Sequence, residues 1–180
     1  KPYKVNLAFQ GIRIDAFEKF SDETYTLLRE SGVKSLDIGI ETLNNRILKN
    51  VDKFLTRDQI LKTLEKLEKQ DFIFKFNILA GLPGQTKEDI DSDIKEAIKI
   101  SKKHKNSYVL YNIYVPFPNT KLYNEAIKSG FIPPPTFEAW GAFAGTSWMK
   151  KYSWFPKKTR KYLQDINFLF CPYCQNVKYL

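Results

Sequence analysis

The sequence predicts an α/β fold, an incomplete parallel (βα) barrel of about four strand–helix units with a C-terminal helical extension. Four strand-like runs begin near residues 5, 36, 73 and 108, and a helical pattern follows each of them. Parallel strands need a helical crossover between them, and a barrel spends roughly 30 residues on each unit. An open doubly wound sheet has a similar spacing, so the spacing alone leaves both architectures open.

The first two units have clear boundary signals. Residues 5–9 form a short apolar run with strand character. Ser21 is a suitable N-cap for the helix that follows, and Gly32 ends that helix at a position where glycine is favoured. Residues 36–40 alternate between apolar and other residues, which predicts the second strand.

The third unit begins after a second capping signal. Thr56 and Gln59 have the spacing of a capping box, and the helix they open carries apolar residues on one side. Residues 72–79 are short, aromatic and β-branched, which favours a strand over a helix. Thr86 then caps a long helix whose predicted buried stripe consists of Ile90, Ile94, Ala97, Ile98 and Ser101.

The fourth strand is predicted over residues 108–115, and a helix over 121–128 stops at Gly130. Three consecutive prolines then begin at residue 133, and such a run is stiff and extended. We therefore divide the chain into a barrel portion, residues 1–132, and a C-terminal extension, residues 133–180. An amphipathic helix is predicted within the extension at 157–170.

Composition excludes some classes of function. The chain has 180 residues, 43% of them hydrophobic and 27% charged, and a net charge of +9. The lysines are scattered over helix faces, so a solvated surface is favoured over nucleic-acid binding. The densest basic segment, residues 150–161, could touch RNA, a carrier or an acidic partner. No run is long enough to span a membrane, and two cysteines provide no disulfide framework, so a cytoplasmic location is expected.

Polar residues follow each predicted strand, where ligands bind in parallel α/β folds. Arg13 follows the first strand and could pair with a ligand carboxylate, or with Asp15 or Glu41. Glu41 directly follows the second strand. Its carboxylate could accept hydrogen bonds from ribose hydroxyls or an ammonium group, or simply stabilise a helix N-terminus. Either role is compatible with the sequence.

The third turn contains Gly81, Leu82, Pro83 and Gly84. Its glycines allow positive φ and close approach of a ligand to the backbone. The alternative is a tight strand-to-helix turn with no ligand, stiffened by Pro83. The fourth turn, residues 116–120, is rich in proline and polar residues.

Two further residues have the chemistry of metal ligands. Cys171 and Cys174 have the spacing of half a zinc site or of a redox dithiol. The chain lacks the other ligands, so thiols without a metal are favoured over a site completed by another segment or subunit. His104, the single histidine, is predicted to be solvated at a helix end.

Four motifs in order resemble the radical S-adenosylmethionine superfamily. Residues 38–43, Ile-Gly-Ile-Glu-Thr-Leu, with Arg46, Leu48 and Lys53 after them, resemble the family's "GIES…R.L…K". Residues 76–89 resemble its "GLPGET.ED" segment, residues 116–123 its "PxPGTxLY", and residues 13–15 its "RID". These motifs are most similar to those of the cobalamin-binding and methylthiotransferase-like branches.

The resemblance implies the C-terminal part of a partial (βα)6 barrel and S-adenosylmethionine cleavage by a [4Fe-4S] cluster, which yields a 5′-deoxyadenosyl radical. It implies that Glu41 contacts the ribose or amino group of the cofactor. The turn 81–84 would lie against the adenine, and Arg13 would approach the methionine carboxylate. Cobalamin is a further cofactor implied for some branches, and the substrate would be a small or carrier-bound organic molecule.

The sequence also departs from the family motifs, and these departures change the function that we expect. The cluster motif CxxxCxxC is absent, Gln85 stands where Glu is common, and Asn119 where Gly is common. We expect the cluster ligands outside this chain, on an N-terminal barrel segment or another subunit, and the isolated chain to be inactive. Two alternatives stay open: a non-catalytic module that binds a partner or carrier, and a different barrel enzyme with Glu41 as general base.

Overall fold

A computed structural model of the protein describes residues 5–51, 55–141 and 154–173, the stretch 167–173 by its backbone alone. One parallel sheet has the strand order β1-β2-β3-β4. Its strands are β1 (Leu7–Arg13), β2 (Val33–Glu41), β3 (Ile73–Ala80) and β4 (Ser107–Ile113). The four predicted strands are therefore confirmed, with ends that differ by a few residues.

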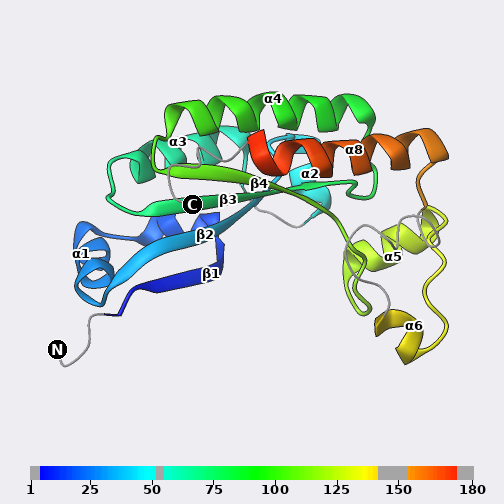
Figure 1. The fold of residues 1–180 in the computed structure, drawn as a ribbon, viewed down its shortest axis with the longest axis horizontal. Helices are drawn as coiled ribbons and strands as arrows, with labels where there is room; N and C mark the ends of the chain where they lie inside the picture. The colour runs from blue at the N-terminus through cyan, green and yellow to red at the C-terminus, as the bar shows by residue number, and fades with distance from the viewer. Residues whose placement is uncertain (1–4, 52–54, 142–153, 174–180) are drawn as a thin grey trace.

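The order of the strands decides between the two architectures. Each strand pairs with the next one along the chain, without a reversal. Helices α3 (Arg57–Glu68), α4 (Lys87–Lys103) and α8 (Lys157–Tyr173) lie along one face of the sheet (Figure 1). A doubly wound sheet reverses its strand order and covers both faces, whereas right-handed crossovers in one direction leave one face bare. The fold is the predicted arc of a parallel barrel.

The predicted helix caps are confirmed. The hydroxyl of Ser21 accepts a hydrogen bond at the start of α1 (Asp22–Glu30), and both Thr56 and Thr86 form complete capping boxes. Two short elements, η1 (Ile14–Lys19) and α2 (Asn45–Asn50), were not predicted, because neither is long enough to show a period. The other helices in the described part of the chain are α5 (Lys121–Lys128) and α6 (Phe137–Gly141).

The core lies between the sheet and the helix layer. Alternate strand residues point into it and are buried: Leu36, Ile38, Ile40, Phe74, Phe76, Ile78 and Val109. Burying a side chain of this size contributes about 1.5–3 kcal/mol. The other strand residues point to the opposite face, called here the inner face, along which no described helix lies (Figure 1).

Helix α8 packs against β4 and α4. Leu163 is fully buried and joins the core of the sheet. The Tyr162 hydroxyl donates to Asp91, while the Lys87 ammonium lies 4.5 Å from the centre of the Tyr162 ring. The division at residues 132 and 133 stays a prediction, and α8 extends the same helix layer as α3 and α4.

Two predictions about α4 and its end were wrong. His104 is 4% exposed and lies edge-on to Phe76, with 5.7 Å between ring centres. The chain bends at this C-cap residue toward β4, which turns the imidazole into the core. Ile98 is 37% exposed and Ile100 is buried, because the buried side of α4 is turned toward Asp93 and Ile100.

The β1 edge is open to solvent. Leu7 and Phe9 are 37% and 44% exposed, and β1 pairs with β2 on its other side. A bulge at Gln10 and Gly11 separates the Phe9 pairing from the Ile12 pairing, with Gly11 at a φ of 74°. Among the described helices, none has the length and apolar character needed to cross a bilayer.

Candidate functional site

The second strand ends in a strained turn at Glu41. Its φ is 70°, a conformation that costs a residue with a side chain about 1–3 kcal/mol. The backbone N–H of Thr42 donates to the carbonyl of Ile40 at 3.0 Å, which closes a γ-turn centred on Glu41. Strain of this kind persists only where the surrounding structure holds it.

The residue that holds this turn is Asp93 on α4. Asp93 is 1% exposed, and its carboxylate accepts hydrogen bonds from the Thr42 hydroxyl at 2.6 Å and the Leu43 N–H at 2.9 Å. Burial raises the pKa of Asp93, and these hydrogen bonds partly oppose that rise. The two residues after Glu41 are thus tied to a helix that begins after the next strand.

The same carboxylate reaches the third turn through Gln85. The Gln85 amide donates to Asp93 at 3.2 Å, and its oxygen accepts from the backbone N–H groups of Gly81 at 2.7 Å and Leu82 at 3.2 Å. We call Thr42, Leu43, Gln85 and Asp93 the Asp93 network. Sequence reasoning treated Gln85 only as a departure from the family motif. It missed Asp93, because Thr42 and Leu43, which donate to Asp93, lie about 50 residues earlier in the chain.

The glycines of the third turn have local structural roles. Gly81 and Gly84 both have a φ of 78°. A Cβ at Gly81 would lie 3.0 Å from the Phe155 ring, so this glycine allows close packing with the residues before α8. The Gly84 carbonyl accepts from Arg46 at 2.8 Å. Any contact of the turn 81–84 with a ligand remains a prediction.

A second tie joins the same two turns closer to the surface. The Arg46 guanidinium forms an ion pair with Asp89, and the Asn44 amide donates to the same carboxylate at 2.6 Å. Burial opposes ionisation of Asp89, but hydrogen bonds from Thr86 and the Arg46 charge lower its pKa overall. Arg46 and Asp89, both within the motifs noted above, therefore act as structural partners.

Arg13 lies at the same edge of the sheet as Glu41. Its guanidinium pairs with Asp15 at 2.8 Å, one of the two partners considered from the sequence. The hydrogen bond with Asp15 and the charges of Asp15 and Glu41 raise the pKa of Arg13. Arg13 is also the register partner of Gly39, two residues before Glu41. The structure thus brings Arg13 and Glu41 to one edge, as the prediction requires.

The backbone of the fourth turn, residues 116–120, explains why asparagine can stand at position 119, where the family commonly has glycine. Asn119 has a φ of 64°, in the left-handed region that asparagine tolerates better than most residues. Asparagine therefore substitutes for glycine there without a change of backbone. Thr120 caps α5, since its hydroxyl accepts from the Tyr123 N–H at 3.1 Å.

A small apolar cluster covers the carboxyl ends of the strands. It is formed by Ile47 of α2, Leu82 of the third turn and Tyr114 after β4, with Leu79 and Trp154 packed against them. Burial raises the pKa of Tyr114 to about 12, so the phenol stays neutral. The cluster thus places apolar side chains from three successive strand-end segments in contact with one another.

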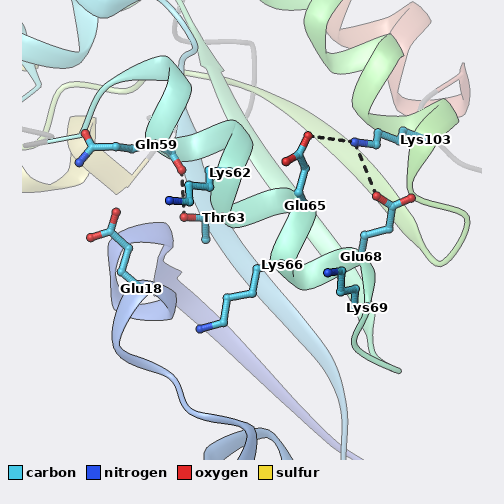
Figure 2. Close-up of a pocket in the computed structure, with 9 residues that line it drawn as sticks. All are labelled: Glu18, Gln59, Lys62, Thr63, Glu65, Lys66, Glu68, Lys69 and Lys103. Carbon is cyan, nitrogen blue, oxygen red and sulfur yellow. Dashed lines mark hydrogen bonds and ion pairs between the residues drawn. The ribbon is translucent and has the colours of Figure 1, made fainter.

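The hollow drawn in Figure 2 lies elsewhere, on the helix layer beside η1 and α3. Three of its charged side chains pair with one another: Lys103 pairs with Glu65 at 3.3 Å and with Glu68 at 3.7 Å. The Lys66 ammonium donates to the Phe20 carbonyl at 2.5 Å, which caps the turn after η1. None of the residues that line this hollow is a predicted site residue.

The structure offers no metal site in the residues that it describes, where no group of three or more potential ligands comes together. Cys171 falls in the last part of α8, with only its backbone described, and Cys174 lies outside the described residues. Their predicted roles stay untested. The residues that the structure describes do not fit an iron–sulfur cluster, since no set of ligands for one comes together among them.

The fold is that of a parallel α/β barrel protein, and its candidate site lies at the carboxyl ends of the strands. Residues 2–97 match the family described as the radical SAM superfamily, and the chain belongs to this superfamily. The heme chaperone HemW of Lactococcus lactis is 32% identical over 91 residues, which is 50% of this chain and 24% of that protein.

Two further proteins are similar to this chain. An uncharacterized methyltransferase, PH0819, of Pyrococcus horikoshii is 26% identical over 113 residues, or 63% of this chain and 24% of that protein. The methyltransferase TsrM of Kitasatospora setae, solved with cobalamin and a [4Fe-4S] cluster, shares the fold with a TM-score of 0.51 and 14% identity. That alignment covers 64% of this chain and 23% of TsrM. The chain thus spans about a quarter of the length of these proteins.

Proposed function

We propose that this chain forms the cofactor-cradling part of a radical SAM enzyme, with the carboxyl ends of β1, β2 and β3 facing S-adenosylmethionine. The observation that carries the proposal is the strained Glu41 turn, which the buried Asp93 braces. A carboxylate held at a strand end by a second layer of hydrogen bonds is preorganised for a ligand. The backbone strain at Glu41 is typical of functional sites.

The roles of the residues follow from their contacts. The Glu41 carboxylate would accept hydrogen bonds from the ribose hydroxyls or the amino group of the cofactor. To bind the methionine carboxylate, Arg13 would either give up its ion pair with Asp15 or contact both carboxylates at once. A guanidinium suits a carboxylate partner. Because the N–H groups of Gly81 and Leu82 already donate to Gln85, the third turn would offer the adenine its carbonyls and its apolar surface.

The iron–sulfur cluster belongs to residues outside this chain in our proposal. The described residues hold no ligand set for this cluster. The complete enzyme would carry out radical chemistry on a small or carrier-bound organic substrate, and the isolated chain would be inactive. Cobalamin dependence stays a prediction from resemblance.

The open edge of β1 supports a partner for this portion of the barrel. Its exposed Leu7 and Phe9 lie on a strand whose outer backbone groups can pair with another strand. We propose that an N-terminal barrel segment or another subunit covers this edge and brings the cluster ligands.

Equilibrium dialysis of S-adenosylmethionine against the longest polypeptide that contains this chain tests the proposal. Glu41→Gln should weaken binding about tenfold, the effect of losing one charge-assisted hydrogen bond. Glu30→Gln, at the exposed end of α1, is the matched control and should bind like the unmodified protein. If the unmodified protein and both variants bind S-adenosylmethionine with equal affinity, the proposed contact of Glu41 with the cofactor is excluded. A reconstituted protein that neither holds iron nor releases 5′-deoxyadenosine would favour a non-catalytic module.

A further inference from the structure

The inner face of the sheet is polar at positions where barrel interiors are normally filled by branched aliphatic residues. Strand alternation places Asp37 of β2, Lys75 and Asn77 of β3, and Tyr108 and Asn112 of β4 on this face. We call these residues the inner-face cluster. None is fully buried, so the cluster is open to a ligand.

Two opposite charges of this cluster are neighbours that do not pair with each other. Asp37 and Lys75 are register partners on adjacent parallel strands. Opposite charges at such positions ordinarily attract one another across the strands. Within the part of the chain that the structure describes, no ion pair joins them, although both side chains are placed.

Each charge has a different neutral partner instead. The Asn77 amide donates to the Asp37 carboxylate, and the Asn112 amide donates to Asn77 at 3.0 Å. The Lys75 ammonium lies 5.6 Å from the centre of the Tyr108 ring, and its hydrogen bond with Tyr108 raises the pKa of Lys75. The Asp37 carboxylate and the Lys75 ammonium thus each have a neutral neighbour, and the charge of Asp37 also raises the pKa of Lys75.

The cluster is separate from the strand-end site. Asp37 precedes Glu41 by four residues, which is about 13 Å along a strand at roughly 3.3 Å per residue. A ligand on the cluster would lie deeper in the barrel than a molecule bound at Glu41, and on the same face as Arg13.

We propose that the inner-face cluster is a binding site for the amino-acid group of a small molecule, whose ammonium meets Asp37 and whose carboxylate meets Lys75. The pair of separated charges matches the two charges of such a zwitterion, and Asn77 and Asn112 add donors and acceptors beside it. The role of this cluster as a substrate site rests on the proposed function, because the cofactor at the strand ends would then face the bound ligand. Its role as a binding site does not depend on the proposed function.

Ligand-observed NMR titration of the longest polypeptide that contains this chain tests the site with three probes. L-Alanine carries both charges, ethylammonium only the positive one and acetate only the negative one. L-Alanine should bind at least tenfold more tightly than either of the others. Asp37→Asn should weaken L-alanine binding about tenfold and abolish ethylammonium binding, while Lys75→Met should do the same for L-alanine and acetate. The exposed positions Asp71→Asn and Lys95→Met are matched controls that should change nothing.

The outcomes separate this site from the cofactor site, since S-adenosylmethionine also carries an amino-acid group. Glu41→Gln should weaken S-adenosylmethionine binding and leave L-alanine binding intact. Loss of L-alanine binding in Glu41→Gln but not in Asp37→Asn would assign the probe to the strand ends and overturn the inference. Equal binding of all three probes to the unmodified protein, or no binding at millimolar concentration, would also overturn it. None of these results bears on the proposed contact between Glu41 and S-adenosylmethionine.

Discussion

The Thr42 hydroxyl donates a 2.6 Å hydrogen bond to the buried carboxylate of Asp93, across 51 residues of sequence. Through Gln85 the same carboxylate is joined to the third turn. The two turns that would cradle a cofactor are therefore one unit, and a change at Asp93 should be felt at both.

Replacing Asp93 by alanine should destabilise the protein by about 2–5 kcal/mol. The change leaves the Thr42 hydroxyl, the Leu43 N–H and the Gln85 amide without their buried acceptor, and each such loss is costly. Urea unfolding measures the difference. Asp58→Ala is the control, because that side chain is 90% exposed and should change stability by less than about 0.5 kcal/mol. Similar losses in both variants would contradict a bracing role for Asp93.

Gln85→Glu should make stability fall as the pH rises. The new carboxylate would lie beside Asp93, and two neighbouring carboxylates raise the pKa of the pair in the folded state. The folded protein would then bind a proton that the unfolded chain releases, so the stabilising contribution is present at low pH and lost above it. Unfolding midpoints at pH 5 and pH 8, compared with those of the unmodified protein, measure this. A pH profile parallel to that of the unmodified protein would count against the contact.

His104 should make the protein less stable in mild acid. Burial lowers the pKa of His104 below its usual 6.5, so the unfolded chain takes up a proton before the folded protein does. Stability should therefore decrease as the pH falls below about 6.5. Urea unfolding from pH 8 to pH 5 should show this decrease, and His104→Phe should flatten it while keeping the ring contact with Phe76. An unchanged slope in the variant would show that another group is responsible.

Gly81→Ala should destabilise the protein more than Gly130→Ala. Both glycines have positive φ, but a Cβ at Gly81 meets the Phe155 ring at 3.0 Å, while none of the described atoms lies within 4 Å of a Cβ at Gly130. The shared cost of the backbone is about 1–2 kcal/mol, and the excess at Gly81 measures the contact with Phe155. Adding Phe155→Leu to Gly81→Ala should recover part of that excess in thermal unfolding. If both glycine variants lose the same stability, Phe155 does not restrict the turn.

Local signals in the sequence determined the secondary structure and the order of the units. Ser21, Thr56 and Thr86 act on backbone groups three residues away, so their role can be inferred from spacing alone. The alternation of residues in β2 and β3 likewise indicates which side chains face the core. For the same reason the sequence placed Arg13 and Glu41 at strand ends.

Tertiary structure alone decided the contacts that hold the site. Asp93 faces Thr42 and Gln85 only after β2, β3 and α4 have packed, and no spacing along the chain reports that meeting. His104 is buried because the chain turns at the end of α4, although its neighbours in sequence are charged. Capping depends on local hydrogen bonds, whereas burial and the partners of a buried carboxylate depend on elements far apart in sequence. The sequence therefore determined the barrel units and the candidate site, and their assembly decided what holds Glu41 in place.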